Sequence, residues 1–171
     1  MALYVLLPTL LLAVVVQTAL FSQISVLGVK PDLMLVATAG WAITRGVKEG
    51  ALWVILGGLL VDLFSSAPLG RSTIALTPVL ILAVIARMVE VESSFLLSLG
   101  VIFIGTLLYE SISRLVLQAW HIQLAWGYSL LWIALSSALV NTLLAPPVYW
   151  ALHYLCKQSS PAKGITFTRE Q

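Results

Sequence analysis

The sequence predicts an all-α polytopic membrane protein with six transmembrane helices. Of its 171 residues, 60% are hydrophobic and only 9% are charged, and the mean hydropathy is +1.04. A soluble domain carries about 25% charged residues. Long apolar runs, such as residues 3–21 and 94–112, supply the roughly 20 residues that a helix needs to cross a bilayer. The lack of clustered Lys and Arg argues against nucleic-acid binding, and the single cysteine excludes an internal disulfide.

The positions of glycine, proline and charge interrupt the apolar runs and divide them into six predicted helices. These helices cover residues 3–22, 31–44, 49–65, 72–88, 94–118 and 128–156. Residues 1–157 would then form a single six-helix domain, and residues 158–171 a polar cytoplasmic tail that we expect to be disordered. The second and third helices are short and are joined by a tight polar turn at 46–50. A five-span arrangement, in which these two helices form a re-entrant pair, therefore remains open.

The basic residues predict the orientation of the helices. If the N-terminus is cytoplasmic, the cytoplasmic segments hold Arg45, Lys48, Arg87, Lys157, Lys163 and Arg169. The outer segments then hold only Lys30 and Arg71, with Arg114 inside the fifth helix. Because cytoplasmic segments carry an excess of Lys and Arg, both termini are expected in the cytoplasm.

In this orientation, charged side chains of both signs gather at the outer face. They are Asp32, Asp62 and Glu110, together with Lys30, Arg71 and Arg114. A charge at the membrane centre costs at least about 2.5–3.5 kcal/mol on insertion scales, and pairing lowers that cost. Glu110 and Arg114 stand four residues apart, the spacing at which helical side chains meet, so an ion pair is predicted. Either member could also contact a partner helix or a ligand.

The stretch GLLVDLFSSAPLGRS (58–72) places a carboxylate in an apolar helix and follows it with a turn. Gly58 lies one turn before Asp62, so this small face allows another helix or loop to come close. The turn at Pro68–Gly70 could bring Arg71 back to the carboxylate. Alternatively, Asp62 could accept backbone N–H groups of that turn and of the next helix. We expect Asp62 to fix this connection, with direct contact to a partner protein as the alternative.

Small residues mark one face of the last helix. Ala134, Ser137, Ala138, Asn141 and Ala145 recur there at helical spacing, a pattern typical of close helix packing in lipid. This face could pack inside the protein, or it could dock a membrane helix of another protein. Asn141 needs a hydrogen-bond partner near mid-membrane, and Gln17 on the first helix is the candidate.

The sequence lacks the motifs of zinc proteases, serine hydrolases and phosphate-binding loops. Its two histidines, His121 and His153, belong near opposite membrane faces, so they are not expected to share a metal. We therefore expect no enzymatic activity, no cofactor and no metal site. Trp41, Trp120, Trp126 and Trp150 fall near helix ends and are predicted to form aromatic belts at the membrane surfaces.

Three short motifs carry a family resemblance. They are Pro31-Asp32-Leu33 at the start of the second helix, the basic turn at 45–50, and Gly58–Asp62 followed by Ser65–Gly70. With these motifs, its size and its six-span layout, the chain resembles the MreD family of bacterial rod shape-determining membrane proteins. The last three helices match that family mainly as hydrophobic patterns.

The resemblance implies a non-enzymatic scaffold in the complex that elongates the lateral cell wall, in the bacterial cytoplasmic membrane. Such proteins associate with the bitopic protein MreC and are linked to the actin-like MreB filament. They work alongside the glycosyltransferase RodA and a class B penicillin-binding protein, which build peptidoglycan. The candidate structural or partner-contact residues are Asp32, Gly58, Asp62, Pro68, Gly70, Arg71, Glu110, Arg114, Ser137 and Asn141.

The family fold looks similar to the six-helix substrate-binding subunits of energy-coupling-factor transporters, which supplies an alternative function. A vitamin-capture subunit would hold its ligand among the outer polar groups. Such subunits often carry an Ala-x-x-x-Ala patch on the first helix, whereas Ala13 and Ala19 are six residues apart here. A third class, an ion-coupled transporter that uses Asp62 and Glu110, would want an inverted repeat and a mid-membrane acid, and neither is evident.

Overall fold

The structure, a computed structural model, describes residues 3–21, 23–26, 28–65, 67–88, 95–121 and 128–158. Within these ranges every element is helical, apart from an isolated antiparallel bridge between Val26 and Val29. The all-α class is thereby confirmed. The predicted tail lies outside the described residues beyond Gln158, where the last helix ends.

Six continuous helical segments coincide with the six predicted helices to within a few residues. The first is α1 (Leu3–Val16) with the π-helical turn η1 (Gln17–Phe21), and the second is α2 (Leu33–Arg45). The third joins α3 (Val47–Leu52), the π-helical turn η2 (Trp53–Gly57) and α4 (Gly58–Phe64). The last three are α5 (Arg71–Met88), α6 (Phe95–Ala119) and α7 (Tyr128–Gln158).

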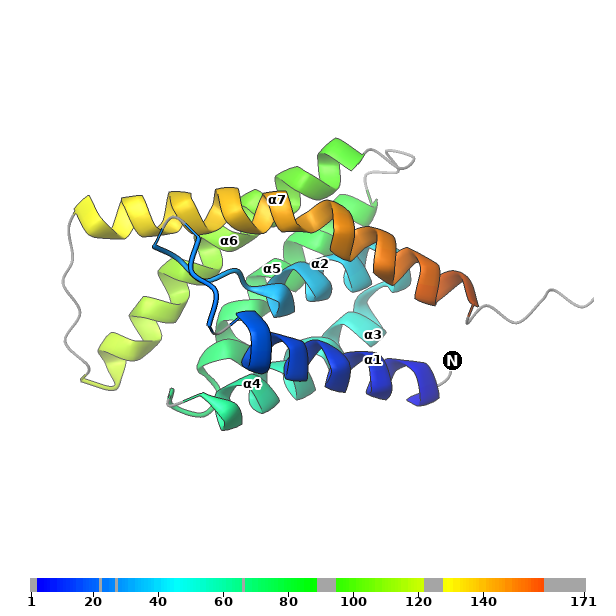
Figure 1. Cartoon of the computed structure of the whole chain (residues 1–171), viewed down its shortest axis with the longest axis horizontal. Helices are drawn as coiled ribbons and strands as arrows, with labels where there is room; N and C mark the ends of the chain where they lie inside the picture. Colours follow the sequence, from blue (N-terminus) through cyan, green and yellow to red (C-terminus); the bar gives the residue numbers. More distant parts are fainter. Residues whose placement is uncertain are drawn as a thin grey trace, which may run out of the picture.

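Successive segments run in alternating directions along the molecule, with α6 crossing the others at a steep tilt (Figure 1). The chain therefore enters α1 and leaves α7 at the same end of the bundle (Figure 1). This arrangement agrees with two termini on one side of a membrane.

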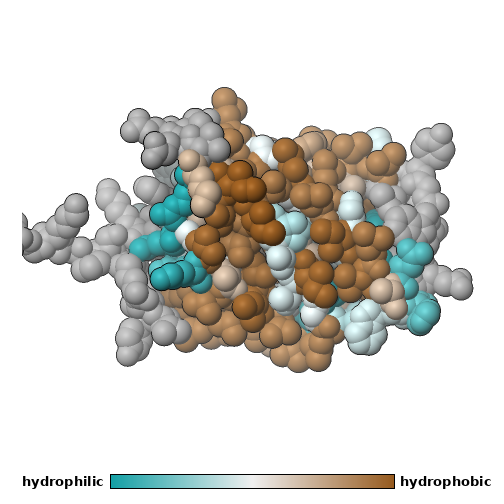
Figure 2. Space-filling view, turned by 180° about the vertical axis from the view of Figure 1, so that it is seen from behind, coloured by the Kyte–Doolittle hydropathy of each residue, from teal (hydrophilic) through white to brown (hydrophobic). Residues whose placement is uncertain are grey.

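Three helices of the described part are long and apolar enough to cross a bilayer. They are Arg71–Met88, Leu96–Ala119 and Leu131–Leu152, and Leu6–Phe21 and Leu33–Arg45 are shorter apolar helices. A wide apolar surface separates polar patches at the two ends of the molecule (Figure 2). These features are those of a membrane protein with three candidate spanning helices, while the count of six spans stays a prediction.

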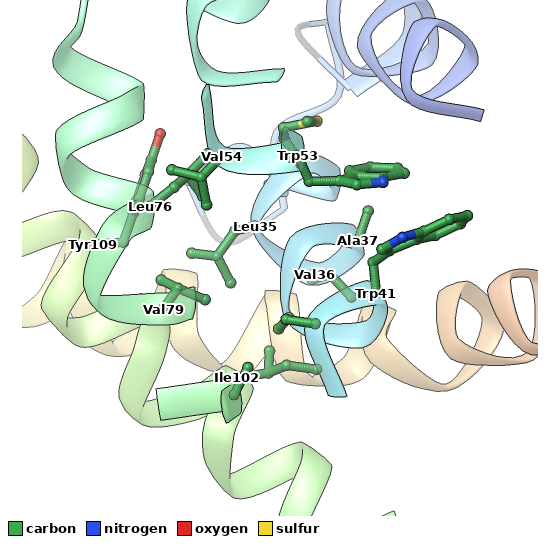
Figure 3. Close-up of a cluster of buried hydrophobic side chains, with 14 of the residues drawn as sticks. Leu35, Val36, Ala37, Trp41, Trp53, Val54, Leu76, Val79, Ile102 and Tyr109 are labelled. Carbon is green, nitrogen blue, oxygen red and sulfur yellow. The ribbon is translucent and has the colours of Figure 1, made fainter. Parts of the chain in front are cut away.

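α2 is the central helix of the bundle. All nine residues from Met34 to Ala42 are buried, because α5, α7, α6 and the α3–α4 segment surround the helix. Side chains from these neighbours, among them Val54, Leu76 and Val79, close over Leu35 (Figure 3). Because neighbouring helices cover every side of this stretch, residues 34–42 do not face lipid.

The position of Trp41 corrects one sequence-based prediction. Its ring is 1% exposed and lies 5.1 Å from the ring of Trp53, at an interplanar angle of 30° (Figure 3). The indole Nε1 of Trp41 donates a hydrogen bond of 3.0 Å to Glu49. Trp41 is therefore a core residue, because the central position of α2 leaves no route from its ring to the membrane surface. Trp120 and Trp150 are exposed, which agrees with the predicted belts, and Trp126 lies outside the described residues.

The turn between α2 and α3 is a single residue, Gly46, and is tighter than the predicted 46–50 turn. Its N–H donates to Ala42 O and its carbonyl accepts from Gly50 N, so it belongs to both helices. Its φ of +91° and ψ of −173° fall in a region open essentially to glycine alone. A side chain here would also meet the guanidinium of Arg87 at the end of α5.

The small-residue face of α7 packs inside the protein. Ala134, Ser137, Ala138, Asn141 and Ala145 are all buried, since α7 lies against α2 and α6. The approach to α2 is close enough that a Cβ on Gly40 would stand 3.1 Å from Leu152. Internal packing is thus confirmed, and this face is not free to dock another protein. Pro146 and Pro147 lie within α7, which bends in its second half (Figure 1).

Candidate functional site

The candidate site is a group of charged and hydroxyl side chains at the end of the bundle where α2 and α5 begin and α4 ends. We call it the polar cluster. Its members are Asp32, Asp62, Arg71, Ser72, Tyr109, Glu110, Ser113, Arg114, Ser137 and Asn141. The sequence places these residues on five separate segments, so the fold brings them together. Lys30, which the sequence also predicts among them, is exposed.

Asp62 organises the α4–α5 turn through backbone contacts. Its side chain is 1% exposed, and its Oδ2 accepts hydrogen bonds of 2.8 Å from Gly70 N and 3.1 Å from Ser72 N. The carboxylate therefore supplies acceptors for N–H groups of the turn and of the first turn of α5, which lack helical partners. The sequence suggests either Arg71 or backbone N–H groups as partners of Asp62, and the structure shows backbone N–H groups.

Two glycines make room for this arrangement. Gly70 adopts a φ of +90°, which turns the chain from Pro68 into α5 at little cost for a residue without a side chain. Gly58 lies against the start of α5, where a Cβ would stand 2.7 Å from Thr73 N and 2.8 Å from Thr73 Cα. The motif residues Gly58, Asp62 and Gly70 thus form one structural unit.

Arg71 does not form an ion pair with Asp62, contrary to one of the two expectations. Its Nε donates a hydrogen bond of 2.5 Å to the Oγ of Ser113, a fully buried residue of α6. The charge of Arg71 also acts on the carboxylates of Asp32 and Glu110. Arg71 therefore links the start of α5 to α6 and offsets two acids.

The predicted pair between Glu110 and Arg114 is confirmed. The Nε of Arg114 lies 3.9 Å from Glu110 Oε2, and the two side chains are 14% and 23% exposed. Glu110 also interacts with the hydroxyl of Ser137 on α7. The two groups are mostly buried and each offsets the charge of the other, so we assign the pair a role in charge balance.

Two amide side chains hold the buried start of α2. Asn141 accepts a 2.8 Å hydrogen bond from Asp32 N and donates to Thr106 Oγ1 at 3.4 Å. Gln17 accepts from Leu33 N at 2.7 Å and donates to Pro31 O at 3.3 Å. The Asp32 carboxylate accepts from Leu35 N at 3.0 Å, as an N-cap residue does.

These contacts correct two expectations. The sequence suggests Gln17 as the partner of Asn141, but the two amides bind neighbouring residues of the same helix start instead. The sequence also predicts Asp32 at the membrane face, yet its N–H bonds to Asn141, which lies at the middle of the apolar segment Leu131–Leu152. The start of α2 is therefore recessed into the bundle, because the short second helix does not reach as far as α5 and α7.

Sequence reasoning missed Tyr109 and Ser113 as members of the polar cluster, and it missed Thr106, which bonds to the cluster member Asn141. Their signal is visible in retrospect, because residues 106, 109, 110 and 113 follow helical spacing on one face of an otherwise apolar helix. Tyr109 interacts with both Asp32 and Ser72, and Thr106 bonds to Ile102 O and Asn141. One face of α6 therefore supplies partners to α2, α5 and α7.

The polar groups of the cluster bond to one another and to nearby backbone groups. Asp32 and Asp62 accept from backbone N–H groups, and Glu110 pairs with Arg114. Ser113 accepts from Arg71, and Asn141 accepts from Asp32 N. Among the described residues, no group of three or more His, Cys, Asp and Glu is arranged to hold a metal ion. Comparisons with protein-family models, curated proteins and solved structures found no match to the chain. The role of the cluster therefore has to be inferred from its geometry.

Proposed function

We propose that the chain is a non-enzymatic membrane scaffold of the bacterial cell-elongation complex, similar to the MreD family. In this proposal six helices span the cytoplasmic membrane, both termini are cytoplasmic, and the direct partner is MreC. The indirect partners are MreB, RodA and a class B penicillin-binding protein. The complex supports synthesis of the lateral peptidoglycan wall.

One observation supports the proposal most. The motif that carries the resemblance, Gly58 to Gly70, forms one unit in which Asp62 binds the backbone of the turn that follows it. A motif whose residues contact one another in the fold supports a family relationship more strongly than a motif whose residues lie apart. The alternating directions of the six helical segments (Figure 1) also agree with a six-span layout.

The way the polar cluster is satisfied favours a scaffold over a capture subunit. A substrate-capture site needs polar groups directed into an open cavity. Here Asp62, Arg71 and Asn141 direct their hydrogen-bonding atoms at the chain itself. Such contacts stiffen a helix bundle, which is what a protein that positions other membrane proteins requires.

The partner-binding surface must differ from the one suggested by the small-residue face of α7, since that face is buried. The remaining surface of α7 carries large exposed apolar side chains, among them Leu139 at 58%, Leu143 at 79% and Trp150 at 83%. We therefore expect changes at Leu143, and not at Ser137, to weaken association without unfolding the bundle.

Co-purification with MreC tests the proposal. The chain would be co-expressed with MreC, extracted in several mild detergents and captured through a tag on MreC, with an unrelated bitopic protein as the control bait. We expect retention by MreC alone, and reduced retention for Leu143→Ser. Equal recovery with both baits, or none with MreC in any detergent, would contradict the proposed function.

A further inference from the structure

The helices of the bundle differ in length, and two of them are longer than the hydrocarbon core of a bilayer is thick. The α3–α4 segment and α5 each contain 18 residues, which is about 27 Å at 1.5 Å per residue. In contrast, α6 has 25 residues and α7 has 31, or about 37 Å and about 46 Å. At the polar-cluster end, α6 and α7 extend past the ends of the shorter helices (Figure 1). We call this extension, residues 114–119 and 128–136, the α6–α7 arm.

Large apolar side chains are exposed on the arm and directly after its α6 part. Leu115 is 55% exposed, Leu131 is 62% and Trp132 is 72%, and Trp120, the residue after α6, is 61% exposed. Tryptophan at the surface of a membrane helix is typical of the interface between lipid and water. The two tryptophans therefore indicate that this surface is covered by lipid up to their level.

The spacing of exposed aromatic residues on α7 gives a second, independent measure. Trp132 and Trp150 are 18 residues apart, or about 27 Å, and Trp132 and Tyr154 are 22 apart, or about 33 Å. Both Trp150 and Tyr154 are exposed, at 83% and 65%. These distances bracket the ~30 Å thickness of the hydrocarbon core. α7 thus carries an aromatic anchor at each surface of one bilayer. Trp132 marks the surface nearer to the polar cluster.

The polar cluster lies below that level. Ser137 is five residues further along α7 than Trp132, about 7–8 Å deeper, and Asn141 is nine residues further, about 13–14 Å deeper. Asp32 N bonds to Asn141 and Glu110 interacts with Ser137, so these two acids lie at about the depths of Asn141 and Ser137. A full-thickness leaflet over α4 and α5 would bury the turn at 65–70 and the ends of both helices in hydrocarbon.

We infer that the protein has an asymmetric bilayer footprint, in which lipid has its full thickness along the α6–α7 arm and is thinned over the α4–α5 turn. Lipid headgroups and water descend there to the polar cluster. α5 is long enough to cross a bilayer, but it begins below the level of Trp132, and a helix end that falls short of the bilayer surface is accommodated by local thinning at a modest cost per ångström. The inference depends on the membrane placement in the proposed function, but not on MreC or any other partner.

Nitroxide accessibility in proteoliposomes tests the inference. Single cysteines would be placed at Leu69 in the turn, which is 60% exposed, and at Leu135 in the arm, which is 44% exposed, after replacement of Cys156 by Ala. The vesicles would contain phosphatidylethanolamine and phosphatidylglycerol with acyl chains of ordinary length. Collision rates with a water-soluble nickel chelate and with oxygen, which partitions into lipid, would be compared at each site.

We expect the nickel chelate to dominate at position 69 and oxygen to dominate at position 135. Dominance of the nickel chelate at both positions would overturn the inference and would mean that the arm projects into water. Dominance of oxygen at both positions would overturn it as well, since the leaflet would then have uniform thickness. The accessibility at positions 69 and 135 does not depend on whether the protein binds MreC, so the footprint and the proposed function are tested separately. Cysteine at exposed Leu131 provides a second arm site if Leu135→Cys fails to fold.

Discussion

The turns at the two ends of the bundle join neighbouring helices in different ways. The α2–α3 turn is the single residue Gly46, whose N–H and carbonyl both keep helical hydrogen bonds. The α4–α5 turn covers residues 65–70 and interrupts the backbone ladder, so N–H groups at the start of α5 need another acceptor. The buried carboxylate of Asp62 provides it. A short turn thus depends on backbone freedom, whereas a long turn in apolar surroundings depends on a polar side chain.

Replacement of Asp62 is expected to have the largest effect on stability. Asp62→Ala leaves the N–H groups of Gly70 and Ser72 without an acceptor, and each buried unsatisfied donor costs about 1–3 kcal/mol. The midpoint of thermal unfolding in detergent should fall strongly, and a protease should cut the 65–70 turn more rapidly. Ser111→Ala is the control, because Ser111 is exposed on α6 and its hydroxyl bonds to Leu107 O of the same helix. Equal midpoints for the two variants would show that the carboxylate does not hold the turn.

The α2–α3 turn should respond to loss of backbone freedom instead. Gly46→Ala forces a residue with a Cβ into a conformation open essentially to glycine, at a cost of about 1–3 kcal/mol, and brings that Cβ against Arg87. Gly100→Ala is the matched control, because Gly100 is helical and has open space where its Cβ would be. If both variants unfold at the wild-type temperature, glycine is not required at position 46. The double variant Gly46→Ala/Arg87→Ala should recover only the steric part of the loss.

The recessed start of α2 offers a test of intermediate size. Asn141→Leu removes the acceptor for the single donor Asp32 N, and one unsatisfied buried donor costs about 1–3 kcal/mol. Gln17→Leu should cost less, because Gln17 is only partly buried. Chemical denaturation in mixed micelles would rank the two variants. The opposite ranking would mean that Gln17 on η1, and not Asn141 on α7, fixes the start of α2.

The smallest effect is expected for the ion pair on α6. Arg114→Gln should change the unfolding free energy by at most about 1 kcal/mol, because the pair is 3.9 Å apart and Arg71 also offsets the charge of Glu110. The same unfolding assay, at low and high salt, measures this change. A loss as large as that of Asp62→Ala would show that charge pairing, and not backbone capping, dominates the polar cluster.

The sequence was sufficient to predict the helical segments and their approximate limits, because apolar runs and their Gly, Pro and charged breaks are local features. It also predicted the Glu110–Arg114 pair, whose geometry follows from the helix itself. The sequence also predicted that Asp62 and Arg71 lie at the same end of the bundle, because successive helices run in alternating directions. Each of these predictions depends only on residues that are close in sequence or on the order of the helices.

Contacts between distant segments could not be predicted in the same way. The partners of Asn141 depend on how deep α2 begins relative to α7, and no local pattern records that depth. The burial of Trp41 follows from the central place of α2, whereas the sequence indicates only that Trp41 lies near a helix end. The choice of Asp62 between Arg71 and backbone N–H groups required the conformation of the turn at Gly70.

The central claim is that the Asp62 carboxylate orders the α4–α5 turn by accepting its backbone N–H groups. Hydrogen exchange, measured by mass spectrometry on peptides that cover residues 67–76, tests it most directly. We predict slow exchange of the Gly70 and Ser72 amides in the wild type and fast exchange in Asp62→Asn, with no change in peptides that cover the Gly46 turn. Equal exchange of the two amides in wild type and variant would contradict the claim.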